Sequence, residues 1–217
     1  MKGLFISFEG LDGCGKSTQI ALLAEKLVAE NYRIRVVREP GSTPIGEEIR
    51  HLLKDSAGSV MSAETELLLL NSSRAQLVQE VIRPALEQGE IVLCDRYADS
   101  SIAYQGYGRR LNMSDVSVIT HFATNGLQPD LTFLLTAPPA ISKSVRALGD
   151  RIEREDIEFH WRVYRGFLQL ADAEPARFRS IAYRAGDVTG MHREIYEMTQ
   201  QHLTDNQDKY VFGSHNA

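Results

Sequence analysis

The stretch Gly10 to Ser17, which reads GLDGCGKS, constrains the fold more than any other part of this chain. It matches G-x-x-x-x-G-K-[ST] at every fixed position, and it lies between an apolar run at 4–8 and a helix-compatible run at 18–23. Glycines let such a loop curl until its N–H groups and the next helix N-terminus converge on a phosphate. Lys16 adds a positive charge, and the Ser17 hydroxyl suits Mg²⁺. The motif predicts a bound nucleoside triphosphate, the alternative being a glycine-rich turn that binds nothing.

Composition and charge narrow the class of protein. The chain has 217 residues, of which 43% are hydrophobic and 24% charged, as in globular proteins of one domain. The formal net charge of −5 argues against extended nucleic-acid binding and still allows a local basic pocket. Cys14 and Cys94 form no disulfide framework, no apolar run is long enough to span a membrane, and Met1 leads straight into a predicted strand. We therefore expect a cytoplasmic protein with no membrane or nucleic-acid partner.

Short apolar runs alternate with longer segments of helical period, which predicts an α/β fold with a parallel sheet flanked by helices. We expect strands near 3–9, 33–38, 90–95, 130–136 and 178–184. Helices are expected over most of 16–30, 44–54, 62–88, 98–106, 114–125, 138–148, 155–173 and 188–203. No repeat or linker divides the chain, so we expect one domain over 1–217, with a frayed tail from about 205 to 217.

Polar residues follow the predicted strands at the edge where ligands bind in such sheets. The loop 38–44 and Arg50 follow the second strand, and Asp95 and Arg96 end the third. Arg74 lies four residues after Leu70 on the 62–88 helix, so both side chains project from one side. Each feature also has a structural interpretation: turn chemistry for the loop, a solvated helix face for Arg74, and a salt bridge for Asp95 and Arg96.

The segment 143–156 is dense in charge and contains a glycine near its middle. A charge run of this kind is often only a solvated surface. Its basic residues could instead close over phosphates as a mobile lid. These residues are Lys143, Arg146, Arg151 and Arg154.

The phosphate-loop motif alone leaves GTPases, ATPases and small-molecule kinases open, although the chain lacks the guanine-selecting N-K-x-D. Six segments taken together resemble the thymidylate kinase family: FEGLDGCGKSTQ, REPGSTPIGEEIR, TELLLLNSSRAQ, VLCDRYADSSIAYQG, GLQPDLTFLL and DRIERED. The resemblance covers about 3–178. It implies a five-stranded parallel sheet with a lid, Mg²⁺ as cofactor, a homodimer, and phosphoryl transfer from ATP to dTMP for dTTP biosynthesis.

The same resemblance implies roles for individual residues. Arg50 and Arg96 would hold the acceptor phosphate, Arg74 the thymine edge, and Tyr104 the deoxyribose. Asp12 would lie near the sugar 3′-hydroxyl and the metal, and Asp95 would keep the metal-bound phosphates in register.

The implied catalytic residues are Lys16, Asp95, Arg96, Arg151 and Asp12. The implied ATP-binding residues are Gly10, Asp12, Gly13, Cys14, Gly15, Lys16, Ser17, Thr18, Arg146 and Arg151. The implied acceptor-binding residues are Asp12, Glu39, Pro40, Arg50, Leu70, Arg74, Arg96, Ser100, Ser101, Tyr104 and Gln105. The implied metal ligands are Ser17 and Asp95.

The source of the catalytic arginine follows from position 13. Some members of the family carry an arginine inside the phosphate loop, and this chain has Gly13 there. We therefore expect the lid to supply it, with Arg151 as the first candidate and Arg146 as the second.

Four departures from the family pattern concern the acceptor and the lid. Leu70 replaces a phenylalanine that stacks on thymine, which removes an aromatic contact of about 1 kcal/mol. Ser42 replaces a glycine, so we expect position 42 to avoid backbone shapes that only glycine tolerates. Trp161 stands where an acidic residue is common after the lid, and the pair Ala182-Tyr183 replaces an Asp-Ala pair after the last strand. Two alternatives remain open: a kinase for dUMP or a 5-substituted dUMP, and a nucleotide-binding protein that has lost catalysis.

Overall fold

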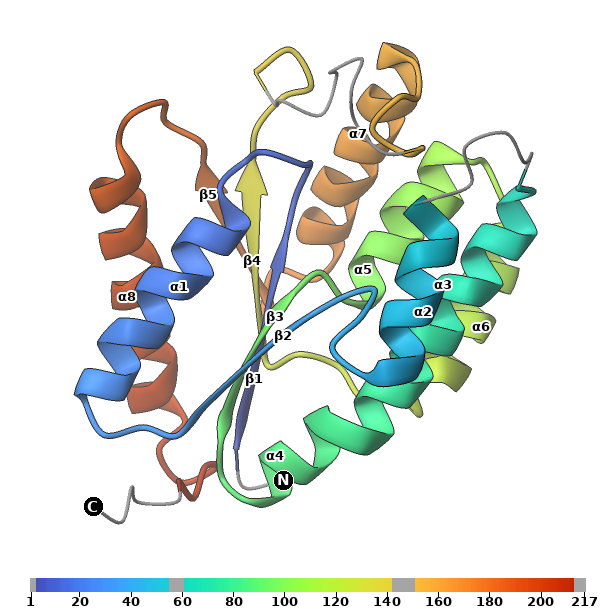
Figure 1. Cartoon of the computed structure of the whole chain (residues 1–217). Coiled ribbons are helices and arrows are strands. Elements are labelled where there is room, and N and C mark those ends of the chain that lie inside the picture. The colour runs from blue at the N-terminus through green and yellow to red at the C-terminus, as the bar shows by residue number, and fades with distance from the viewer. Residues whose placement is uncertain (1–2, 55–60, 142–150, 213–217) are drawn as a thin grey trace.

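The computed structural model describes residues 3–54, 61–141 and 151–212, and its centre is a five-stranded parallel sheet (Figure 1). The strand order is β2-β3-β1-β4-β5, which confirms the predicted fold class. The strands are β1 (Leu4–Glu9), β2 (Ile34–Arg38), β3 (Ile91–Asp95), β4 (Leu131–Thr136) and β5 (Phe178–Ala182). All six residues of β1 are buried, because helices cover both faces of a parallel sheet.

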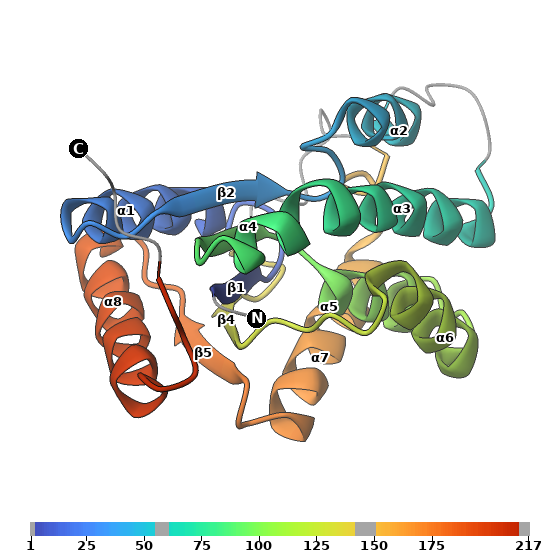
Figure 2. The same ribbon diagram turned by 90° about the horizontal axis from the view of Figure 1, so that it is seen from below.

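Helices lie on both faces of the sheet, and Figure 2 shows α1 and α8 on one side with α3 and α4 on the other. The helices are α1 (Lys16–Ala29), α2 (Pro44–Lys54), α3 (Ala63–Leu77), α4 (Arg83–Glu87), α5 (Ala98–Ser101), α6 (Met113–Thr124), α7 (Ile157–Ala173) and α8 (Val188–Asp205). Two π-helical segments, η1 (Val78–Ile82) and η2 (Ile102–Gly108), continue α3 and α5. Alternation along β1 sends Leu4 and Ile6 toward α1 and α8, and Phe5 toward η1. Among the described residues, no helix is long and apolar enough to cross a membrane.

The predicted helix at 138–148 is wrong over its described part. Residues 138–141 form a turn, in which the Ile141 N–H donates to the Pro138 carbonyl at 2.8 Å. Pro139 explains the difference, because a proline disfavours helical backbone angles at the residue before it. The rest of that segment, 142–148, lies outside the described residues.

The predicted frayed tail is wrong for residues 206–212. Tyr210 is only 6% exposed, and its hydroxyl lies 2.8 Å from Nε2 of His202 on α8. Lys209 donates to Asp130 at 2.6 Å, and Phe212 packs edge-on against Tyr32. Two aromatic side chains therefore hold this end of the chain against the body, and residues 213–217 lie outside the described residues.

The sheet brings three loops to one edge. The register pairs Asp95 of β3 with both Phe8 of β1 and Arg38 of β2, so these three strands end side by side. The phosphate loop follows β1, the loop with Glu39 follows β2, and Arg96 follows β3. Since the carboxyl ends of parallel strands form the ligand-binding edge of such folds, this edge holds the candidate site.

Candidate active site

The phosphate loop has the conformation that its glycines predict. Gly10, Gly13 and Gly15 all have positive φ values, of 132°, 75° and 98°, and α1 begins at the next residue, Lys16. A side chain at Gly10 would meet the Leu135 carbonyl at 2.5 Å, so this position requires glycine for space as well. The Lys16 ammonium donates to the carbonyls of Gly10 at 3.3 Å and Leu11 at 3.1 Å. The Lys16 side chain thus folds back over the phosphate loop.

Ser17 and Asp95 meet at the start of α1. The Ser17 hydroxyl donates to Oδ2 of Asp95 at 2.8 Å, although the two residues are 78 positions apart. Mg²⁺ prefers oxygen ligands and is held by one or two protein groups together with phosphates and water. The part of the chain that the structure describes has no cluster of three or more His, Cys, Asp or Glu residues that could cage a metal. A hydroxyl beside a carboxylate therefore fits a Mg²⁺ ion that arrives with a nucleotide.

Arg96 connects the phosphate loop to the acceptor side. Its backbone is left-handed, with φ at 68°, a strained conformation that tends to occur at functional sites. The guanidinium donates to Asp12 at 2.6 Å, to the Tyr104 hydroxyl at 3.2 Å and to Ser100 at 3.2 Å. Burial would raise the pKa of Asp12, but the charges of Arg96 and Lys16 outweigh it and hold that pKa well below its usual value. Asp12 is therefore an anion that orients Arg96.

Arg74 and Glu39 form a buried ion pair behind this group. Arg74 is 1% exposed, and Nε and Nη2 lie 2.8 and 2.7 Å from Oε2 of Glu39. Its remaining N–H groups donate to Asn71 at 2.8 Å, Ser101 at 2.9 Å and the Tyr97 carbonyl at 3.1 Å. All five donors of the guanidinium are therefore engaged within the chain. The solvated helix face that the sequence allowed for Arg74 is wrong.

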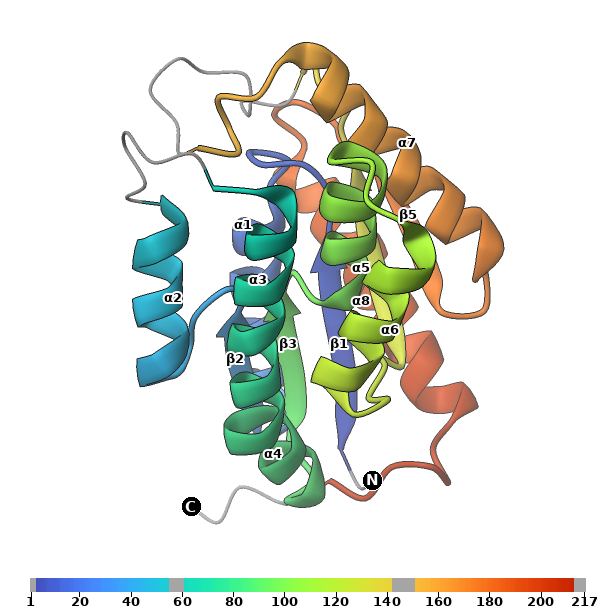
Figure 3. The ribbon, with the colours of Figure 1, turned by 90° about the vertical axis from the view of Figure 1, so that its right-hand side faces the viewer.

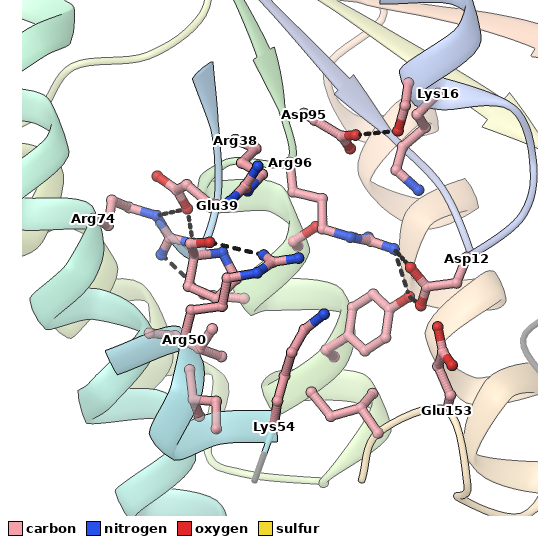
Figure 4. A pocket seen from close by; sticks show the side chains of 18 of the residues that line it. Asp12, Lys16, Arg38, Glu39, Arg50, Lys54, Arg74, Asp95, Arg96 and Glu153 are labelled. Atoms are coloured by element: carbon pink, nitrogen blue, oxygen red, sulfur yellow. Dashed lines mark hydrogen bonds and ion pairs between the residues drawn. The ribbon is translucent and has the colours of Figure 1, made fainter. Parts of the chain in front are cut away.

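One cavity of about 500 Å³ joins these groups (Figure 4). Its predicted lining residues are Asp12, Gly13, Gly15, Lys16, Ser17, Thr18, Glu39, Pro40, Arg50, Leu70, Arg74, Asp95, Arg96, Ser100, Ser101, Tyr104 and Gln105. Two predicted residues, Gly10 and Cys14, are buried in the loop and do not line it. The sequence interpretation missed Arg38, Leu53, Lys54, Ile152 and Glu153. Helical spacing could have found Leu53 and Lys54, which lie three and four residues after Arg50.

The structure places Arg151 outside this cavity. Its Nη2 lies 2.5 Å from Oε2 of Glu66, a carboxylate with no exposed surface. An ionised carboxylate in a buried position attracts such a guanidinium strongly. The role of Arg151 in catalysis stays a prediction, and Arg146 lies outside the described residues, as does most of the predicted lid.

The expectation for Ser42 is wrong, because its backbone lies in the left-handed region with φ at 66°. The Ser42 hydroxyl accepts from the Arg38 N–H at 2.9 Å and donates to the Arg38 carbonyl at 3.2 Å. The Ser42 N–H donates to Glu47 at 2.7 Å. These hydrogen bonds offset the cost of a side chain at a position that favours glycine.

The other departures lie away from the cavity. Trp161 packs edge-on against Tyr164 within α7, with ring centroids 5.7 Å apart. Ala182 ends β5, and Tyr183 is half-buried against the core beside α1 and α8. Both positions are therefore used for packing.

The fold and the site together define a class of protein. A phosphate loop after the central strand faces a cavity whose other wall carries Arg50, Arg74 and Arg96. Two anionic ligands can therefore meet end to end, one on backbone amides and one on guanidinium groups. This arrangement is that of a P-loop kinase acting on a small phosphorylated acceptor.

Comparison with known proteins identifies the family. The thymidylate kinase family model matches residues 8–195. A thymidylate kinase of Desulforudis audaxviator is 50% identical over 181 residues, 82% of each chain. One from Thermoanaerobacter sp. is 45% identical over 94% of this chain and all of its own length. The crystal structure of thymidylate kinase from Ehrlichia chaffeensis superposes with a TM-score of 0.76 at 33% identity, covering 92% of this chain and 100% of that one. The chain belongs to the thymidylate kinase family.

Proposed function

We propose that the chain transfers the γ-phosphoryl group of ATP to dTMP, which gives ADP and dTDP for dTTP biosynthesis. The observation that carries this proposal is the single cavity shared by the phosphate loop and the arginine-bearing wall. Membership of the thymidylate kinase family supports dTMP as the acceptor and disfavours both a dUMP-type acceptor and a loss of catalysis.

The donor side binds ATP through the loop 10–18. Backbone N–H groups of the loop and the N-terminus of α1 hold the phosphates, and Lys16 swings from its loop carbonyls to the terminal phosphates. Ser17 and Asp95 would hold Mg²⁺, which would supply positive charge to neutralise the phosphate groups. Positioning and neutralisation of two anions are the main tasks of such a site.

The acceptor side binds dTMP through groups on four elements. Arg50 of α2 and Arg96 hold the 5′-phosphate with bidentate contacts that suit phosphoryl oxygens. Asp12 keeps Arg96 oriented and lies near the sugar 3′-hydroxyl, and Tyr104 packs on the deoxyribose. The base lies against Leu70 with its edge toward four polar residues. These are Arg74, Ser100, Ser101 and Gln105.

A coupled ADP-release assay with dTMP, dUMP, 5-hydroxymethyl-dUMP and dCMP tests the acceptor. The expected result is the highest kcat/KM for dTMP, and preference for another acceptor contradicts the proposal. Leu70→Phe is the matched variant: it restores an aromatic face, so dTMP binding should tighten by about fivefold, the equivalent of about 1 kcal/mol.

We propose that the catalytic arginine comes from the lid segment, with Arg151 and Arg146 as candidates. Arg151 would have to leave Glu66 to reach the phosphates. Arg151→Ala should then lower kcat far more than it weakens dTMP binding. An equal loss in both would assign Arg151 to the acceptor side.

We propose a homodimer formed through α3 and α6, which pack against each other (Figure 3). Leu68 on α3 and Val118 and Phe122 on α6 are 53%, 65% and 85% exposed, an unusual amount of apolar surface for two neighbouring helices. Phe122→Glu should shift sedimentation from dimer to monomer. Val211→Glu changes an apolar residue 62% exposed at the other end of the chain and should not. A wild-type monomer contradicts this proposal.

The free, buried Cys14 and Cys94 support a cytoplasmic location, where thiols are kept reduced.

A further inference from the structure

Glu66 on α3 is a buried carboxylate shared by three donors from two parts of the site. Gln105 of η2, which lines the cavity, donates its Nε2 to Oε1 at 2.7 Å. Arg109 donates Nη2 to Oε2 at 3.0 Å and Nε to Oε1 at 3.2 Å, and Arg151 donates to Oε2 at 2.5 Å. Arg109 also pairs with Glu155. Glu66 thus joins the acceptor cavity to Arg151 and, through Arg109, to Glu155, both in the described part of the predicted lid segment.

The surroundings of Glu66 keep it ionised. Burial would raise its pKa, but the hydrogen bonds and charge of Arg109, the Gln105 amide and the charge of Arg151 outweigh burial and lower it. An ionised carboxylate accepts hydrogen bonds and donates none. Gln105 must therefore present its NH₂ group to Glu66 and its carbonyl oxygen to the opposite side.

That carbonyl oxygen, Oε1 of Gln105, is buried and has no hydrogen-bond partner among residues 3–54, 61–141 and 151–212. An unpaired buried acceptor is unfavourable, so the site favours a ligand that brings an N–H group to it. Arg74, on the same wall, has all five donors engaged. Gln105 Oε1 is therefore an acceptor on this wall, unpaired among the described residues, that can receive the N–H group of a bound base.

We infer that Glu66 is a positioning residue that sets the polarity of the Gln105 amide, so that the site accepts bases with a ring N–H and rejects bases whose ring nitrogen is an acceptor. This inference rests on the proposed function. Thymine and uracil carry a hydrogen on N3, which can donate to Oε1. Cytosine has a lone pair on N3, which would face the lone pairs of Oε1 and leave both unpaired.

The test measures the ratio of kcat/KM for dTMP to that for dCMP. Glu66→Gln replaces the carboxylate by an amide that can either donate or accept, so Gln105 can rotate and the ratio should fall by about tenfold or more. Gln105→Met removes the acceptor and should lower the ratio as well. In a Gln105→Met background, adding Glu66→Gln should change the ratio no further, because Glu66 acts through Gln105.

Glu155→Gln is the matched control, because Glu155 is the other carboxylate on Arg109 and has no contact with Gln105 among the described residues. It should leave the ratio unchanged. Thermal unfolding and ATP affinity check that each variant is folded, and Glu66→Asp, which keeps a charge for both arginines but retracts it from Gln105, replaces Glu66→Gln if that variant does not fold.

Three results would overturn the inference. These are a wild-type ratio in a folded Glu66 variant, a wild-type ratio in Gln105→Met, and an equal effect of Glu66→Gln with and without Gln105. A failure of the proposed function looks different, because the wild-type chain would then phosphorylate neither dTMP nor dCMP.

Discussion

The donor and acceptor sides of the cavity are built in different ways. On the donor side, eight consecutive residues form the loop, and the contacts of Lys16 stay within that loop. On the acceptor side, Arg74 and Glu39 are 35 residues apart, and Arg96 and Asp12 are 84 apart. The donor side therefore depends on local backbone shape, whereas the acceptor side depends on buried charges that the fold brings together. Substitution of a donor-side residue should therefore lower mainly activity, whereas substitution of an acceptor-side residue should lower both activity and stability.

The largest expected effect is on the acceptor side, with Arg74→Ala. This change leaves Glu39 buried without its cation, so the free energy of unfolding should fall by about 3–5 kcal/mol. Urea denaturation measures it. Arg38→Ala is the control, since Arg38 and Glu47 form a more exposed pair whose loss should cost less than about 1 kcal/mol. Equal losses of unfolding free energy in Arg74→Ala and Arg38→Ala would mean that the buried ion pair matters no more for stability than the exposed one.

Lys16→Ala tests the donor side. Because the ammonium, among the residues that the structure describes, contacts only its own loop, kcat should fall by about 100- to 1,000-fold while the free energy of unfolding changes by less than about 1 kcal/mol. Steady-state ADP release and urea denaturation measure the two quantities. Lys26→Ala, on the exposed side of the same helix, should leave both unchanged. A destabilisation as large as that of Arg74→Ala would show that the two sides are built alike.

A pH dependence should belong to the acceptor side. Glu9 accepts from the Tyr97 N–H at 2.8 Å and the Ser100 hydroxyl at 2.6 Å, and burial followed by the charge of Asp99 raises its pKa to about 8. The folded state binds this proton more tightly than the unfolded state. Its contribution to stability is therefore complete below the usual pKa of 4.5 and is lost as the pH rises through the folded value.

Glu9→Gln should remove that dependence, because the glutamine does not titrate. Its carbonyl oxygen can accept the Tyr97 N–H, and its NH₂ group can donate to the Ser100 hydroxyl oxygen. Between about pH 5 and about pH 8, the wild-type free energy of unfolding should fall by at most about 1.4 kcal/mol per pH unit more steeply than that of the variant. Urea denaturation across this range measures the difference. Parallel profiles would show that Glu9 does not titrate in this way.

The smallest expected effect concerns Ser42, in the loop that joins β2 to α2. Ser42→Gly relieves the left-handed backbone and loses two hydroxyl contacts, so the free energy of unfolding should change by less than about 1 kcal/mol. Ser42→Ala keeps the strained backbone and loses the same contacts, so it should be the less stable variant by thermal unfolding. The reverse order would mean that a side chain at this left-handed position costs no stability.

Much of the architecture could be predicted because its signals are local. Apolar runs mark all five strands, and the phosphate-loop pattern places Lys16 and Ser17 at a helix start. The errors have local causes as well: Pro139 prevents the helix predicted from residue 138, and the contact of Tyr210 with α8 orders a tail that looks polar. Helical period and polarity alone do not register either effect.

In the candidate site, too, some residues could be predicted from the sequence and their tertiary contacts could not. Resemblance to the family brought Arg50, Arg74 and Arg96 together, and all three line the cavity. The partners that decide what these groups do were not predictable. Glu39 takes two donors of Arg74, and Glu66 holds Arg151 outside the cavity. A carboxylate 35 or 85 positions away leaves no local pattern around an arginine.

By itself, the sequence determined the α/β class, the order of strands and helices, and the phosphate loop, because these depend on periodicity and on glycines within a few residues of one another. Only the tertiary structure decided which arginines are engaged, which carboxylates are buried and which way the Gln105 amide points. Those outcomes depend on desolvation and on charges that meet across the sheet edge, and both exist only once the chain has folded.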